Sequence, residues 1–177
     1  MDIDIRKPRL EPKINGIPKD FYDVMGYFNK AIAENKYPFI PRKNPITPNE
    51  ITKLWIPSLD KNLCFLVESD GKIIGSATCL FDVNSNEYEQ AKDRVPGEIA
   101  LTIDPSHNHK LIGKMLISRM AKELLTKHKT GIFHTDVNWT DELKMMAELE
   151  INGKLLENYE RYKKAGLSGK VLEYSLP

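Results

Sequence analysis

Two runs of apolar residues stand close together in the middle of the chain, at residues 63–69 and 72–81. Both are rich in β-branched and aromatic side chains, which favour strands. Asp70 and Gly71 join the two runs, and this residue pair readily takes the positive φ angles that a tight hairpin turn requires. The pattern therefore predicts an antiparallel β-hairpin.

A second pattern covers residues 98–128 and predicts a strand, a polar turn and a helix. Residues 98–104 are β-rich, and Pro105 should end the strand because it cannot donate a ladder hydrogen bond. Apolar residues then recur every three or four positions with basic residues between them, as in an amphipathic helix. They are Leu111, Ile112, Met115, Leu116, Met120, Leu124 and Leu125. The first turn of this helix, with its free N–H groups and nearby basic side chains, suits an anion such as phosphate.

The rest of the chain alternates between helical and strand patterns. We expect a first strand within 3–10, helices at 20–34 and 48–59, a strand at 131–137, a helix from 138 to about 153, helical spacing from 155 to 167, and a last strand at 170–176. A proline-rich loop at 37–48 and a polar loop at 82–96 separate some of these elements. An alternative for residues 154–163 is a strand that forms a hairpin with the last one.

Composition limits the class of protein. The 177 residues and their 41% hydrophobic content fit one domain, residues 1–177. Lys and Arg number 26 against 25 Asp and Glu, so nucleic acid is a poor default partner. No apolar run approaches the roughly 20 residues of a membrane span, and the N-terminus lacks a signal-peptide pattern. We therefore expect a soluble cytoplasmic protein that has no membrane partner.

The sequence holds few metal-binding or nucleotide-binding signals. Cys64 and Cys79 have neither a metal nor a redox spacing, and we expect buried free thiols. The string His107-Asn108-His109 beside Asp104 lacks the spacing of a zinc site, so no metal site is expected. The glycine-rich loops of the common nucleotide-binding enzymes are absent as well.

Residues 97–114 resemble the GNAT superfamily of acyl-CoA-dependent N-acetyltransferases. The hallmark of that family is a strand followed by an Arg/Gln-x-x-Gly-x-Gly/Ala turn, which opens a helix and wraps the pyrophosphate of coenzyme A. In this chain Asn108 falls at the Arg/Gln position, Leu111 at the first Gly and Gly113 at the second. Residues 162–167 also look like the Tyr-Glu-Lys-x-Gly-Phe ending of the family. The resemblance implies an α/β (α+β) fold, with a mixed, mostly antiparallel sheet flanked by helices.

The resemblance also implies a function, transfer of an acetyl group from acetyl-CoA to a primary amine by direct attack in a ternary complex. Glu98 matches the carboxylate base of the family, although a structural Glu is the rival interpretation. Tyr162 matches the general acid that protonates the thiolate, with Tyr159 as the fallback and a packing role as the rival. Phe39 and Trp55 are candidates for the acceptor pocket, or plain core residues. The positions expected to contact the cofactor are Leu101, Thr102, Ile103, Asn108, His109, Lys110, Leu111, Ile112, Gly113 and Lys114.

A second hypothesis is a GNAT-fold protein without catalysis, which binds acyl-CoA or another small ligand as a sensor or interaction module. Leu111 at a glycine position favours this hypothesis, as does Leu155 where the family usually has Asn. Glu98 and Tyr162 together favour the enzyme. The acceptor is expected to be a small-molecule or peptide amine, and a homodimer is compatible with the family.

Overall fold

The computed structural model describes residues 2–34, 44–80, 98–104, 106–127, 132–137, 152–157 and 170–175. Its main feature is a seven-stranded sheet with the order β1-β4-β5-β6-β7-β9-β8. The strands are β1 Ile3–Arg6, β4 Leu63–Ser69, β5 Lys72–Leu80, β6 Glu98–Ile103, β7 Ile132–Val137, β9 Lys170–Ser175 and β8 Asn152–Glu157. Neighbours in this sheet pair antiparallel except for β6 and β7, which run parallel.

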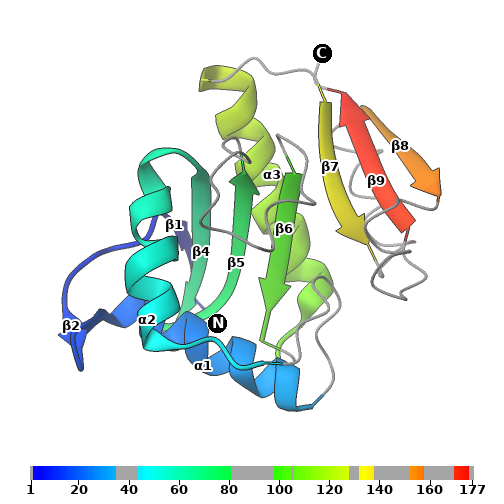
Figure 1. The fold of residues 1–177 in the computed structure, drawn as a ribbon. Helices are drawn as coiled ribbons and strands as arrows, with labels where there is room; N and C mark the ends of the chain where they lie inside the picture. Colours follow the sequence, from blue (N-terminus) through cyan, green and yellow to red (C-terminus); the bar gives the residue numbers. More distant parts are fainter. Residues whose placement is uncertain are drawn as a thin grey trace.

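Helices lie on both faces of the part of the sheet formed by β1, β4, β5 and β6, as Figure 1 shows. Helix α1, Lys19–Ala33, and a short helical run that begins with α2, Pro48–Glu50, lie on one face. Helix α3, His109–Lys127, lies on the other face. The expected mixed, mostly antiparallel sheet with flanking helices is therefore confirmed.

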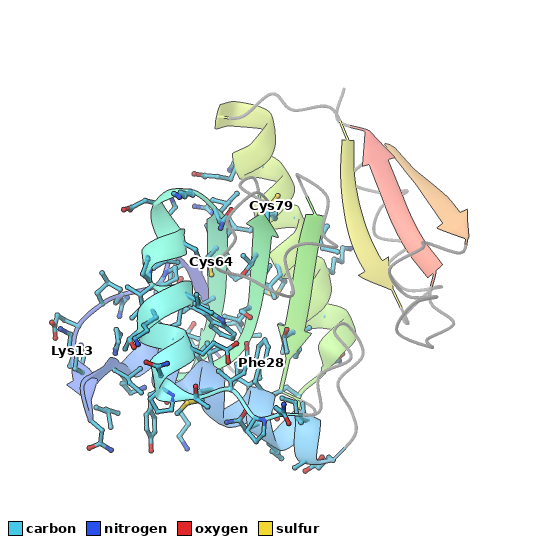
Figure 2. The ribbon with its side chains drawn as sticks, viewed as in Figure 1. Lys13, Phe28, Cys64 and Cys79 are labelled. Atoms are coloured by element: carbon cyan, nitrogen blue, oxygen red, sulfur yellow. The ribbon has the colours of Figure 1, made fainter. Side chains whose placement is uncertain are left out.

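Two tight hairpins each turn at an Asp-Gly or Asn-Gly pair with positive φ angles. The predicted hairpin of β4 and β5 turns at Asp70 and Gly71, whose φ angles are 50° and 75°. A small hairpin that the sequence analysis missed pairs β2, Lys13–Ile14, with β3, Ile17–Pro18. It turns at Asn15 and Gly16 with φ angles of 50° and 81°, and Figure 2 labels Lys13 at the start of β2. Asn-Gly is a strong hairpin signal, but strands of two residues show no periodicity that would reveal it.

The core on the α1 face is built from residues of α1, the sheet and the helical run. One face of α1 buries Phe21, Val24, Tyr27 and Phe28 at the helical spacing that the sequence predicts. Trp55 packs edge-on against Phe28, with the ring centroids 5.5 Å apart. The predicted second helix is present but irregular, because a turn of α-helix leads into a π-helix, Ile51–Trp55, and a 3-10 helix, Pro57–Asp60.

The core on the opposite face packs the sheet against α3. Its fully buried helix residues are Ile112, Leu116, Ile117 and Met120. Gly75 of β5 leaves room for this contact, since a Cβ atom there would lie 3.3 Å from the Thr102 carbonyl oxygen and 3.5 Å from the Ile112 side chain. A larger residue at position 75 would push β6 or α3 away.

The cysteines are buried free thiols, as predicted. Cys64 pairs with Thr78, and Cys79 pairs with Leu63, so the two thiols lie on opposite faces of neighbouring strands. Figure 2 labels both. Burial raises the pKa of Cys64 to about 11, so this thiol stays protonated at neutral pH and is not a nucleophile.

The prediction of helical structure from residue 155 onward is wrong for residues 155–157. These residues belong to β8, which pairs antiparallel with β9 through Leu155↔Leu172 and its neighbours. A short apolar run such as Leu155-Leu156 is compatible with both helical spacing and strand alternation. The pairing with β9 determines that it forms a strand. The alternative, a strand at 154–163 that pairs with the last strand, is confirmed for residues 154–157. The helix predicted from 138 to about 153 lies outside the described residues up to 151, and it is wrong at Asn152 and Gly153, which begin β8. Residues 158–169 also lie outside the described residues.

A cluster of ion pairs fixes α1 to the first strands. The guanidinium of Arg6 donates to both Asp20 oxygens at 2.6 and 2.8 Å and, through Nε, to Glu68 at 2.6 Å. The backbone N–H of Arg9 also donates to Asp20 at 2.6 Å. Burial alone would raise the pKa of Asp20, but these donors hold it below its ordinary value.

Removing Asp20 from this cluster is expected to be costly. Asp20→Ala leaves the half-buried Arg6 with one carboxylate partner and should lower the free energy of unfolding by about 3 kcal/mol. The matched control is Glu11→Ala, since Glu11 and Lys13 form an ion pair whose side chains are 74% and 52% exposed. Urea denaturation measures both variants, and losses of equal size would contradict this account of the cluster.

Candidate functional site

The site predicted from the sequence lies where β6 separates from β7 and leads into α3. Strand β6 pairs with β5 from Glu98↔Leu80 to Ile103↔Gly75. Within the described strands, its pairing with β7 is limited to Ile99↔Thr135. Figure 1 shows β7, β9 and β8 as a group set apart from the strands on the other side of β6.

The backbone of β6 beyond Ile99 has one paired edge and one open edge. The N–H of Asp104 donates to the Ile74 carbonyl at 2.8 Å and so continues the ladder with β5. Residues of an antiparallel strand alternate between bonding to this neighbour and directing their N–H and C=O groups the other way. Thr102 therefore bonds toward β5, whereas Leu101 and Ile103 direct their backbone groups toward the side of β7. An extended ligand can pair with such an edge as a further strand would.

Glu98 begins β6, one residue before Ile99, which pairs with Thr135 of β7. Further along β6, Thr102 is buried and pairs with Ser76. The hydroxyl of Tyr27 donates to Ser76 Oγ at 2.8 Å. Helix α1 therefore covers the face of the sheet that carries Thr102 and Ser76.

The turn between β6 and α3 is organised by Asp104. The N–H and hydroxyl of Ser106 donate to Asp104 Oδ1 at 2.9 and 2.5 Å, and Lys30 Nζ of α1 lies 3.7 Å from the same oxygen. His107 Nδ1 lies 3.7 Å from Oδ2. Burial alone would raise the pKa of Asp104, but the hydrogen bonds from Ser106 and the nearby Lys30 and His107 hold it below its ordinary value. The link from Lys30 to Asp104 joins segments that are distant in the sequence, so no local pattern predicts it.

The first turn of α3 brings together the residues that were expected to bind phosphate. His109 and Lys110 open the helix, and Asn108 precedes it as the N-cap. The side-chain oxygen of Asn108 accepts a hydrogen bond from the Leu111 N–H at 3.3 Å, and its carbonyl accepts one from Ile112 at 3.2 Å. The sequence analysis missed this cap, although Asn immediately before a helix is its usual signal.

The side chains in this turn face different surroundings. Leu111 is 47% exposed, Lys114 is exposed, and Ile112 and Gly113 are buried. The leucine at the glycine position of the motif thus directs much of its side chain to solvent. Helix α3 therefore exposes Leu111 and Lys114 shortly after the open edge of β6.

The remaining predicted site residues are only partly placed. Trp55 is half-buried against the core of the α1 face, in contact with Phe28. Phe39, Tyr159 and Tyr162 lie outside the described residues. Among the residues that the structure describes, no group of His, Cys, Asp and Glu is arranged to hold a metal ion. In the same part of the chain, no helix has the length and apolar character to cross a membrane.

A family model described as the acetyltransferase (GNAT) family matches residues 30–146, which contain β6, the turn and α3. The chain belongs to this family. A sequence search of curated proteins gave no significant match. The expectations of acetyl transfer as the general activity and of acetyl-CoA as the cofactor are confirmed at the level of the family.

Solved structures of GNAT proteins share the fold at low sequence identity. An N-acetyltransferase from Staphylococcus aureus Mu50 is 16% identical with a TM-score of 0.66, and the match covers 99% of this chain and 98% of the other. A phosphinothricin acetyltransferase from Sinorhizobium meliloti, in complex with acetyl-CoA, is 13% identical with a TM-score of 0.68 and coverages of 99% and 89%. A GNAT acetyltransferase from Streptococcus pneumoniae is 14% identical with a TM-score of 0.67 and coverages of 99% and 100%.

The turn at Asp104 should make stability depend on acid pH. Because the folded pKa of Asp104 lies below the ordinary value, its ionised form adds stability that is present above about pH 4 and is lost as the pH falls through the lowered pKa. Asp104→Asn should therefore lower the free energy of unfolding at pH 7 more than at pH 3. Urea denaturation at both values checks this, with Glu11→Gln as the exposed control. An equal loss at both pH values would contradict the assignment.

Proposed function

We propose that this protein is an N-acetyltransferase that moves the acetyl group of acetyl-CoA to a primary amine by direct attack in a ternary complex. The observation that carries the proposal is the edge of β6, which pairs with β7 at Ile99 and then directs the backbone groups of Leu101 and Ile103 away from β5. This open edge leads directly to the first turn of α3. A long ligand with amides at one end and a pyrophosphate at the other fits that order of groups.

The residues of this stretch suit the parts of acyl-CoA. The open backbone groups of Leu101 and Ile103 match the amides of pantetheine, which would pair with β6 like a short strand. The N–H groups of His109 and Lys110 in the first turn of α3, with the charge of Lys114, suit the pyrophosphate. Acetyl-CoA supplies the acetyl group as an activated thioester.

Transfer also requires a base, a donor to the carbonyl oxygen and an acid. An alkyl amine has a pKa of about 10.4, so it must lose a proton before it attacks, and Glu98 takes this proton directly or through water. The N–H of Leu101, on the open side of β6, donates to the carbonyl oxygen as the C–N bond forms. The C–S bond then breaks, and Tyr162 gives its proton to the departing sulfur. Phe39 and Trp55 contribute to the acceptor pocket.

Solved proteins with this fold are named for different acceptors. They include a ribosomal-protein-S5-alanine acetyltransferase from Vibrio fischeri and a spermidine N-acetyltransferase chimera. The fold thus accommodates both protein and small-molecule acceptors, and we propose for this chain a small-molecule or peptide amine. We further propose that the chain is one cytoplasmic domain that assembles, if at all, as a homodimer.

A second candidate function is a non-catalytic sensor or interaction module that binds acyl-CoA or another small ligand. The engagement of the Leu111 N–H with Asn108 favours a small ligand without a pyrophosphate in this role, because a pyrophosphate would use the donors of that turn. Calorimetric titration with acetyl-CoA, followed by an assay of CoA release with a panel of primary amines, separates the two. Binding with turnover supports the enzyme, and binding without turnover for any amine class supports the sensor.

Glu98→Gln removes the proposed base while keeping the size of the side chain. We expect kcat to fall by roughly 10²-fold or more, with a higher pH optimum and unchanged affinity for acetyl-CoA. Glu50→Gln, on α2, is the control and should behave like the wild type. Steady-state kinetics over a pH series measure this, and unchanged kinetics would remove Glu98 from the mechanism.

Tyr162→Phe removes the proposed acid with the loss of one oxygen atom. We expect kcat to fall by at least tenfold while the affinity for acetyl-CoA stays the same. Tyr159→Phe is the same substitution at the neighbouring tyrosine and should leave kcat near the wild-type value. The opposite result, a loss for Tyr159→Phe alone, would move the acid to Tyr159 and show that the motif is aligned incorrectly at Tyr162.

A further inference from the structure

The side chain of Asn108 occupies a backbone donor in the turn that the proposed function assigns to the pyrophosphate. Its oxygen accepts the hydrogen bond of the Leu111 N–H at 3.3 Å. Residue 111 stands at the first glycine position of the family motif, and residue 108 at the Arg/Gln position. In this chain, one donor of the turn is thus already bonded to a neighbouring side chain.

An N-cap oxygen and a phosphate oxygen compete for the same groups. The first N–H groups of a helix have no partner within the helix, and either a capping side chain or a bound anion satisfies them. The cap of α3 therefore competes directly with a phosphate at this position.

The two halves of the turn differ in how firmly they are held. On the side of β6, Asp104 accepts two hydrogen bonds from Ser106, at 2.9 and 2.5 Å, and lies near Lys30 of α1. On the side of α3, the Asn108 cap is exposed, and its 3.3 Å bond is long for an N–H···O contact. The Asn108 side chain can thus leave the Leu111 N–H without disturbing the Asp104 half.

We infer that the side chain of Asn108 occupies, in the free protein, the hydrogen-bond donor that the cofactor phosphate would use. In the free protein its side-chain oxygen caps α3, and it rotates away when the pyrophosphate of CoA takes the Leu111 N–H. The displacement lowers the affinity for CoA, so Asn108 acts as a positioning residue that weakens cofactor retention and favours release of the product CoA. The inference rests on the proposed cofactor site, but it concerns the groups that occupy the site before binding.

Asn108→Gly tests the inference, because it removes the competing oxygen at a cap position that glycine tolerates well. Calorimetry should show CoA binding about fivefold more tightly than to the wild type, which corresponds to about 1 kcal/mol. Pantetheine, which lacks the pyrophosphate, should bind equally to both. Thr47→Gly is the matched control, since Thr47 caps α2 through a bond of the same 3.3 Å length to Glu50, and it should not change CoA binding.

Other outcomes have distinct meanings. Weaker CoA binding by Asn108→Gly would overturn the inference and make Asn108 a direct phosphate ligand, and equal binding would also overturn it. Asn108→Ser retains a capping oxygen and should stay near the wild-type affinity, so it provides a second test if the glycine variant does not fold. If CoA binds only to the glycine variant, the inference holds; if neither binds, it fails.

The inference and the proposed function can fail separately. If Asn108→Gly binds CoA more tightly than the wild type but no amine is acetylated, the proposed enzymatic function is refuted and the role of Asn108 stands. If an amine is acetylated but Asn108→Gly binds CoA more weakly than the wild type, the enzymatic function is supported and the role of Asn108 is refuted.

Discussion

The open edge of β6 is the constraint on which the proposed site depends. In an antiparallel ladder one strand edge bonds to one neighbour, so the other edge needs a second strand, water or a ligand. Strand β7 supplies this second partner at Ile99↔Thr135, and the described strands have no further pairing there. Leu101 and Ile103 consequently present backbone groups next to the first turn of α3. The proposed cofactor site combines the unmet hydrogen bonds of a strand with those of a helix end.

Two features hold this geometry in place from the α1 side. Lys30 reaches Asp104 in the turn between β6 and α3, while the Arg6 cluster fixes the start of α1 to β1 and β4. Gly75 allows β6 and α3 to approach β5 closely. Helix α1 is thus coupled through Lys30 to the turn between β6 and α3.

Local sequence signals predicted the parts of the fold that local physics determines. Asp70-Gly71 identified the central hairpin, and the spacing of apolar residues identified α1 and α3. The sequence pattern at 155–157 fits both a helix and a strand, because Leu155-Leu156 is compatible with either hydrophobic spacing. The strand forms because these residues pair with β9, a separate segment of the chain. The family motif located the β6–α3 turn. The cap on Leu111 and the link from Lys30 depend on side-chain conformations and tertiary contacts that no motif specifies.

The central claim is that acetyl-CoA binds along the open edge of β6, and backbone amide exchange tests it most directly. NMR-detected hydrogen exchange, with and without acetyl-CoA, should show slower exchange at Leu101 and Ile103 in the complex. Exchange at Thr102, which already bonds toward β5, should change little. Binding of acetyl-CoA without added protection at Leu101 or Ile103 would contradict the account and place the cofactor elsewhere.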